Sequence, residues 1–427
     1  MELTTPDHHA NQDATTREDA PSARGLYASP PRVILLAGKG GVGKTTIAAA
    51  TGLASARAGK KTLIISLDAA HSLADSFDLP VKLHDKHRGQ PIPVGERLEI
   101  QELDVQEEIE RYWGEVYTYV AGLLSSTGLE DTVAEELAVM PGMDDVVGLL
   151  YLNKYAKEGT YDVVILDCPP TGESLRFVSL PHTMEWYFSK LFRIQRNLMR
   201  IARPIARHTI DVPLPQDVVY RDLESLFTRL EGVDRLLLDN TITTIRLVTN
   251  AEKMVVRETQ RAFMYFSLYR MTTDAIIVNR LFPGEITDPY YRKWTQTQQR
   301  HFAEIEELFA PIPVRKVRLF DDEVLGIERL TQLADELFSG VDPVGVWYSA
   351  QPNRFIRGND GEYELQIDLP FVTAGELQLH REKDDLIVRV GNFKRHVPLP
   401  RAVARLAHKR ARINQGVLYV TFGENPP

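Results

Sequence analysis

Residues 33–46 spell VILLAGKGGVGKTT. The first five residues carry short or branched apolar side chains, a pattern typical of a strand that is buried on both faces. The next part is rich in glycine, which adopts positive φ and leaves room for a phosphate to approach the main chain. The stretch therefore predicts a buried strand, a tight turn and then a helix over residues 45–58.

Residues 38–45 match the phosphate-binding pattern G-x-x-x-x-G-K-[ST]. Lys44 is expected to reach the β- and γ-phosphates, and the Thr45 hydroxyl is expected to bind magnesium. A glycine-rich turn without a ligand is the alternative, but the strand–loop–helix context favours a nucleoside triphosphate with its phosphates at the helix N-terminus. The predicted nucleotide contacts in this loop are Gly38, Lys39, Gly40, Gly41, Val42, Gly43, Lys44, Thr45 and Thr46.

Lys39 is a second lysine, which the plain phosphate-binding pattern does not require. With it, residues 39–46 (KGGVGKTT) resemble the signature-lysine class of P-loop ATPases, which includes partition, septum-positioning, nitrogenase-iron and arsenite/tail-anchor ATPases. In that class the first lysine crosses a dimer interface to the partner's phosphates, where it neutralises charge as an arginine finger does. The resemblance implies that Lys39 is catalytic. Because the chain has one such loop, it also implies a homodimer.

Composition excludes several classes of protein. A chain of 427 residues predicts two or three domains, and a net charge of −9 argues against general nucleic-acid binding. The single cysteine, Cys168, excludes a disulfide within the chain. No apolar run reaches the ~20 residues that span a bilayer, and the polar residues 1–31 are expected to be a disordered tail without a secretory signal. A cytoplasmic location is the default expectation.

Two further apolar runs end in aspartate. Residues 61–67 predict a strand beside the first one, followed by Asp68, and residues 161–168 predict a strand that closes on Asp167. Carboxylates at the carboxyl ends of parallel strands lie in the ligand crevice of such sheets. Asp68 is therefore predicted to polarise the attacking water, although it could instead cap a helix. Asp167 is predicted to hold magnesium through a water molecule.

The surroundings of both aspartates resemble one family. Residues 68–73 (DAAHSL) are similar to the D-P-A-H-S-L switch of the arsenite/tail-anchored-protein ATPases, with Ala69 in place of proline. Residues 169–181 (PPTGESLRFVSLP) are similar to the element of that family that senses the nucleotide state. The resemblance implies that Glu252 lines the nucleotide site and that Asn279 contacts the adenine edge, although Asn279 could simply cap a helix. Cys168 is either a redox-tuned thiol or a small buried residue.

Helical patterns predict a subdomain inserted in the sheet, over about 104–158 and 182–240. Residues 98–103 are predicted to be an edge strand, and residues 217–238 one long helix. Residues 182–207 have an apolar face that includes Met184, Trp186, Phe188, Leu191 and Phe192. This face is interpreted in three ways: as core packing, as a groove for a client protein, or as a membrane-surface helix.

The end of the chain changes character. Residues 340–354 contain glycine and proline and predict a linker, and in residues 355–423 apolar and polar residues alternate, which predicts a small β-sandwich. The final segment resembles the small-heat-shock-protein (α-crystallin) domain. Its basic residues indicate either a basic patch or a solvated loop; they are Arg401, Arg405, Lys409, Arg410 and Arg412.

Together these patterns predict a doubly wound, mostly parallel α/β ATPase over residues 32–339, joined to an all-β domain. The expected cofactors are ATP or ADP and Mg²⁺, and no zinc is expected because a Cys-x-x-Cys pair is missing from the sequence. We expect a nucleotide-gated carrier of hydrophobic helical segments, with transient membrane contact possible. The alternatives are a targeting factor for tail-anchored membrane proteins and the ATPase subunit of an arsenite pump. One cysteine suits As(III) poorly.

Overall fold

The computed structural model describes residues 23, 25–68, 72–79, 89–103, 143–187, 217–284, 288–350, 353–358, 362–382 and 385–424. The chain forms two compact units, and the boundary between them falls after Ala350. The expected helical segments within 104–142 and 188–216, and the tail before residue 23, lie outside the described residues. Among the described helices, none is both long and apolar enough to cross a membrane.

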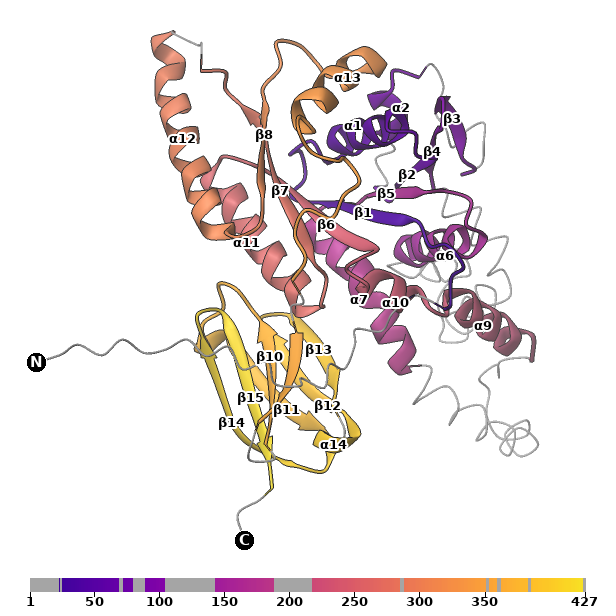
Figure 1. Cartoon of the computed structure of the whole chain (residues 1–427), viewed down its shortest axis with the longest axis vertical. Coiled ribbons are helices and arrows are strands. Elements are labelled where there is room, and N and C mark those ends of the chain that lie inside the picture. Colours follow the sequence, from indigo (N-terminus) through magenta and orange to yellow (C-terminus); the bar gives the residue numbers. More distant parts are fainter. Residues whose placement is uncertain are drawn as a thin grey trace, which may run out of the picture. The chain divides into compact units, whose positions relative to one another are not determined.

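The first unit contains an eight-stranded sheet with the order β3-β4-β2-β5-β1-β6-β7-β8 (Figure 1). Only β3 is antiparallel to its neighbour; the other described pairs are parallel. The strands are β1 (Arg32–Ala37), β2 (Thr62–Ser66), β3 (Ile92–Gly95), β4 (Leu98–Glu102), β5 (Val163–Asp167), β6 (Thr243–Asn250), β7 (Thr273–Leu281) and β8 (Val314–Arg318). Every residue of β2 and β5 is buried, as their unbroken apolar runs predict.

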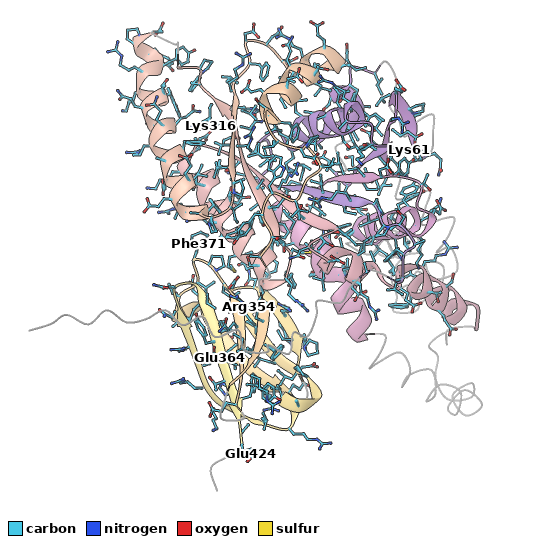
Figure 2. The ribbon with its side chains drawn as sticks, in the orientation of Figure 1. Lys61, Lys316, Arg354, Glu364, Phe371 and Glu424 are labelled. Carbon is cyan, nitrogen blue, oxygen red and sulfur yellow. The ribbon has the colours of Figure 1, made fainter. Side chains whose placement is uncertain are left out.

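Helices cover both faces of this sheet (Figure 1). On one face α1 packs against α13 and α2, and on the other α7 packs against α6, α10 and α11. A cation–π contact joins β8 to α12: the ammonium group of Lys316 on β8, labelled in Figure 2, lies 4.1 Å from the ring centre of Phe302 on α12. The described helices are α1 (Lys44–Arg57), α2 (Leu73–Ser76), α6 (Met143–Glu158), α7 (Thr171–Tyr187), α9 (Asp217–Leu230), α10 (Val233–Leu238), α11 (Lys253–Leu268), α12 (Pro289–Phe309) and α13 (Gly326–Leu337).

The predicted fold class is confirmed, but three local predictions are wrong. Strand β2 does not lie beside β1, because β5 pairs with both of them. A local sequence indicates a crossover but not how many strand positions it skips. Strand β4 is not an edge strand, since a turn at Arg97, whose φ is +60°, lets β3 pair with it. The predicted long helix is divided into α9 and α10 at Gly232, whose φ is +92°.

A segment after α13 packs on the first unit. Residues 341–347, which we call the strap, place the side chains of Val341, Val344 and Trp347 against the apolar cluster beneath α1 and α13. Arg246 of β6 donates to the carbonyl oxygens of Pro343 and Gly345, at 2.7 and 3.0 Å. The strap therefore covers the end of the sheet at which the parallel strands begin.

The second unit is a two-sheet β-sandwich, as the alternating pattern predicts. One sheet has the order β14-β15-β10-β9 and the other β11-β12-β13, and Figure 2 marks Arg354 on β9 and Glu364 on β10. In β10 and in the first half of β15, buried side chains alternate with partly exposed ones: Leu365, Ile367, Leu418 and Val420 are fully enclosed. The strands are β9 (Asn353–Arg357), β10 (Tyr363–Asp368), β11 (Leu377–Glu382), β12 (Asp385–Val390), β13 (Phe393–Pro398), β14 (Ala407–Asn414) and β15 (Val417–Gly423).

Candidate nucleotide site

The glycine-rich loop joins β1 to α1 at the carboxyl ends of the parallel strands. Gly38 lies so close to β6 that a Cβ atom there would stand 2.2 Å from the carbonyl oxygen of Val248. Gly43 has φ of +95°, and a Cβ atom would stand 2.4 Å from Nδ2 of Asn279. Glycine is therefore required at both positions, by close approach and, at Gly43, also by backbone conformation. The loop forms the tight turn that the sequence predicts between β1 and α1, and phosphate binding there stays a prediction.

Lys44 begins α1 and is buried, with 6% of its surface exposed. Its ammonium group lies 3.4 Å from the carbonyl oxygen of Lys39. The side chain thus curls back over the loop instead of extending into solvent. A cation held in this way at a helix N-terminus adds to the positive partial charge of that terminus, and together they form an anion site.

Asp167 ends β5 and is fully buried, and among the described residues neither of its carboxylate oxygens has a hydrogen-bond partner. Burial raises the pKa of Asp167 to about 7. The Thr45 hydroxyl and the Lys44 charge counter this rise, although the hydroxyl is outside good hydrogen-bonding geometry. A buried carboxylate without a partner beside a hydroxyl suits a hard cation such as Mg²⁺, which prefers oxygen ligands. The residues present therefore fit the predicted magnesium position.

Asp68 follows β2. Strand β5 lies between β1 and β2 and pairs with both of them. Its charge contributes to the raised pKa of Asp167, so the two predicted carboxylates do lie near one another. Beyond it, Ser72 donates a hydrogen bond of 3.3 Å to the Thr45 hydroxyl, and Glu102 accepts from the first two N–H groups of α2. The end of the switch-like segment is thereby anchored at both the nucleotide loop and β4; residues 69–71, including His71, lie outside the described residues.

Lys39 pairs within its own chain. Its ammonium group lies 3.8 Å from a carboxylate oxygen of Glu258 on α11, and the other oxygen of Glu258 accepts from the Thr171 hydroxyl at 3.5 Å. Both side chains are partly exposed. Sequence reasoning missed Glu258, since no spacing rule connects two residues so far apart in the chain.

Comparison with known proteins decides the family. Residues 31–339 match the model of a family described as anion-transporting ATPases. The chain belongs to this family. Residues 360–422 match the model described as an HSP20-like domain found in ArsA. The resemblance predicted from the nucleotide motifs and from the C-terminal segment is thus confirmed, and ATP hydrolysis is the activity of this chain.

Relatives match along most of the chain. A protein of Aquifex aeolicus named arsenical pump-driving ATPase 1 is 47% identical over 393 residues, which cover 91% of this chain and 99% of the relative. A Chlorobaculum tepidum protein with a similar name is 32% identical and covers 92% of this chain and 96% of its own. The protein named ATPase get3 of Aspergillus niger is 28% identical over 320 residues. The match covers 73% of this chain and 92% of the relative.

The predicted adenine contact, Asn279, and the predicted nucleotide-site residue, Glu252, lie in different surroundings. Asn279 is buried at the end of β7, and its amide donates to the Val42 carbonyl at 2.9 Å while its Oδ1 accepts from the Arg280 N–H. One amide hydrogen and one lone pair of Asn279 stay available to a base. Glu252 occupies the exposed N-cap position of α11, and its side chain makes no capping hydrogen bond. Arg280, which also contacts the loop, was missed by sequence reasoning.

Cys168 is the buried residue after Asp167. Burial raises the pKa of its thiol, and the Asp167 charge raises it further. Its sulfur lies 3.7 Å from the Leu166 carbonyl oxygen. These surroundings disfavour the thiolate, which is the reactive and metal-binding form. Of the two interpretations of Cys168, the structure favours a small buried residue over a redox-tuned thiol.

Proposed function

We propose that this ATPase works as a homodimeric, magnesium-dependent carrier that uses ATP-driven closure to bind or release hydrophobic protein segments. One observation carries the proposal: helix α7 starts at Thr171, three residues after the β5 strand that ends in Asp167, and its residue Pro181 lines a cavity with apolar and charged walls. A single helix therefore runs from the nucleotide site to this cavity. Helix α7 begins at Thr171 and not near residue 182, where the sequence predicted helix, and it contains Pro181.

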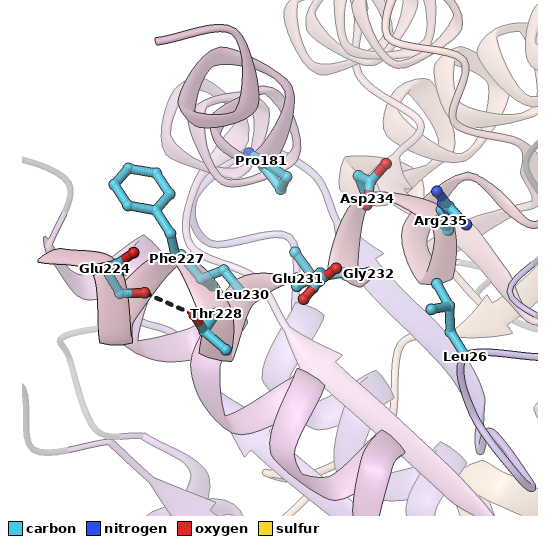
Figure 3. Close-up of a pocket in the computed structure, with 11 residues that line it drawn as sticks. Leu26, Pro181, Glu224, Phe227, Thr228, Leu230, Glu231, Gly232, Asp234 and Arg235 are labelled. Carbon is cyan, nitrogen blue, oxygen red and sulfur yellow. Dashed lines mark hydrogen bonds between the residues drawn. The ribbon is translucent and has the colours of Figure 1, made fainter. Parts of the chain in front are cut away.

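The cavity has a volume of about 410 Å³ and lies between α7, α9 and α10 (Figure 3). Apolar side chains make up much of its wall, whereas most of the charges around it are acidic, from Glu224, Glu231 and Asp234 against Arg235. This combination suits an apolar helical segment that is flanked by basic residues. The apolar lining consists of Leu26, Pro181, Phe227, Leu230 and Val233. The predicted groove residues Phe188, Leu191 and Phe192 lie outside the described residues, as do the side chains of Met184 and Trp186.

The proposed chemistry follows from the positions of the site residues. Lys44 and the loop N–H groups bind the β- and γ-phosphates, and Asp68 orients the water that attacks the γ-phosphorus. Thr45 and, through water, Asp167 would hold Mg²⁺, which would neutralise phosphate charge. Asn279 is proposed to contact the adenine edge, and Glu252 to line the nucleotide site. The products are ADP and phosphate.

The second chain is proposed because of Lys39. Its ion pair with Glu258 joins two partly exposed side chains at 3.8 Å, and such pairs contribute only about 0–1 kcal/mol. A partner's phosphates can therefore compete for Lys39 at little cost. In the closed dimer Lys39 leaves Glu258, crosses to the partner's phosphates and frees Glu258, whose contact with Thr171 lies at the start of α7. Closure is thus linked to the helix that reaches the cavity.

Two alternatives concern the cargo. Targeting of tail-anchored membrane proteins would use the same cavity with a membrane segment as its occupant, and would add transient membrane contact. An arsenite pump subunit matches the names of the bacterial relatives, but As(III) prefers thiolates and this chain offers only the buried Cys168. We expect a cytoplasmic protein without a nucleic-acid partner, and no stimulation of the ATPase by arsenite; stimulation that Cys168→Ser removes would favour the pump.

The carrier proposal is tested with a labelled apolar helical peptide. The Asp68→Asn protein with ATP should hold the closed dimer, in which the peptide flanked by lysines should bind more tightly than a matched peptide flanked by glutamates. Leu26→Asp and Phe227→Asp should weaken binding by about tenfold or more, because each places a charge against an apolar surface. Met254→Asp is the control, since Met254 is an apolar residue on α11 that is 75% exposed and does not line the cavity. Equal peptide binding in all three variants would contradict the proposal.

A further inference from the structure

Two successive carbonyl groups of the nucleotide loop are held by side chains from the end of β7. Asn279 donates from Nδ2 to the Val42 carbonyl at 2.9 Å, and Arg280 donates from Nη1 to the Gly41 carbonyl, also at 2.9 Å. In a trans peptide the C=O and the following N–H point in opposite directions. Fixing these two carbonyls toward β7 therefore turns the N–H groups of Val42 and Gly43 away from β7, toward the space enclosed by the loop.

The donors on β7 are fixed in turn. Arg280 has φ of +59°, a left-handed conformation that is unusual for a residue other than glycine. Its N–H donates to Oδ1 of Asn279 at 2.9 Å, and its carbonyl accepts from Gln298 of α12 at 3.1 Å. The same glutamine side chain accepts from the N–H of Phe282 at 2.8 Å. Helix α12 thus sets the backbone of Arg280, and the backbone directs its side chain to the loop.

We propose that Arg280 is a positioning residue for phosphate binding: together with Asn279 it presents the N–H groups of Val42 and Gly43 to the phosphates before nucleotide arrives. This inference rests on the ATPase site proposed above. Preorganised N–H donors bind charge without reorganising at the moment of binding, so a loop that loses one of these carbonyl contacts must order itself when nucleotide binds. The effect acts on phosphate affinity and leaves the chemical step unchanged.

The alternative explanation is charge alone, because an exposed guanidinium near the loop attracts phosphate even without contacting it. The two explanations differ in their salt dependence. Attraction between exposed charges is screened at high salt, whereas a hydrogen bond that sets backbone geometry is not. A loss of affinity that persists at high salt therefore identifies positioning.

The test uses Arg280→Met in the full-length protein, since methionine is long and unbranched but has no donor. We expect the ADP dissociation constant by calorimetry and the KM for ATP to rise about tenfold, as for the loss of a hydrogen bond from a charged donor. We expect kcat to stay within about twofold and the loss to be the same at low and high salt. Arg280→Lys, which can still donate to the Gly41 carbonyl, should recover most of the affinity.

Arg57→Met is the matched control. Arg57 is the last residue of α1, at the end away from the nucleotide loop, and makes an exposed ion pair of 2.7 Å with Asp335. It should change neither ADP affinity nor KM. If Arg280→Met does not fold, Arg280→Gln replaces it with the same expectation, because glutamine is too short to reach the Gly41 carbonyl.

The outcomes separate the inference from the site on which it rests. Lys44→Ala should lose ADP binding; if it does not, the nucleotide site itself is wrong. If Lys44→Ala loses binding while Arg280→Met binds ADP as the parent does, only the positioning role fails. A loss in Arg280→Met that vanishes at high salt, or a fall in kcat at unchanged KM, would also overturn it.

Discussion

Buried charges lie at both ends of the central sheet, but among the described residues they are paired at one end and unpaired at the other. At the end where the strands begin, Arg32, Arg246 and Asp274 form a closed cluster in which Asp274 lies 3.2 and 3.4 Å from the two guanidinium groups. At the end where the parallel strands finish, Asp167 of β5 is equally buried, but its oxygens lack hydrogen-bond partners within the described part of the chain. The difference shows which end is built for stability and which is prepared for a ligand.

The closed end satisfies its charges with backbone groups. Arg32 donates to the carbonyls of Val33, Ile242 and Val344, and Arg246 donates to two carbonyls of the strap, while Trp347 lies 4.0 Å from the Arg246 guanidinium. Buried arginine is costly unless it is paired and hydrogen-bonded in this way. Burial nevertheless lowers the pKa of Arg32 to about 10 and also lowers that of Arg246. No further ligand is needed there.

The largest effect is expected at the open end. Lys44→Ala should abolish ATP binding, because Lys44 is the buried cation that curls over the phosphate loop. Calorimetric titration with ATP measures the affinity directly. The melting temperature of the Lys44→Ala variant should match that of the parent. Unchanged affinity would remove the phosphate-loop assignment.

The next effect is expected at the closed end. Asp274→Ala leaves two buried guanidinium groups without their shared counter-charge, so it should lower the free energy of unfolding by about 3–5 kcal/mol. Denaturant unfolding measures the loss. Asp335→Ala, which removes only the exposed partner of Arg57, should change stability by less than about 1 kcal/mol. Equal effects of the two variants would mean that burial does not distinguish these ion pairs.

A smaller change in rate is expected for Asp68→Asn. The amide should leave ATP affinity nearly intact but cannot polarise water as a carboxylate does, so turnover should fall at least about 10²-fold. Steady-state phosphate release provides the measurement. Turnover within about twofold of the parent would assign the attacking water to another residue.

The smallest effect concerns Asp145 of α6, which is buried and lies 2.8 Å from Nε of Arg176 on α7. Burial raises its pKa to about 6, despite the opposing effect of Arg176. In the unfolded chain this carboxyl group releases its proton near about pH 4. The folded state therefore binds more protons than the unfolded state between about pH 4 and 6. As a result, the contribution of Asp145 to stability falls as pH rises through that window.

Asp145→Asn removes that titration. Relative to the variant, the parent should therefore lose about 2–4 °C of melting temperature between about pH 5 and pH 7. Differential scanning measurements at both pH values test this. If the difference in melting temperature between parent and variant is the same at both pH values, Asp145 titrates as an ordinary surface carboxylate.

The sequence was most informative where local chemistry has few solutions. Glycine at positions 38 and 43 followed by Lys44 predicted the turn, because only glycine allows both the approach of β6 and the backbone conformation found there. The carboxylates at the ends of β2 and β5 were placed correctly at one edge of the sheet, since parallel strands all end there. The alternating pattern of β10 and β15 likewise predicted the sandwich.

Contacts between distant segments could not be predicted in the same way. The position of β5 between β1 and β2, the Lys39–Glu258 pair and the contact from Arg280 to Gly41 each join residues that no local spacing relates. A periodic pattern states which face of an element is buried but not which element covers it. Sequence by itself thus determined the strand, the glycine-rich loop and the helix, and predicted that they bind nucleotide. Only the tertiary structure decided which side chains hold that loop in shape, because those partners are brought together by packing and not by the order of the chain.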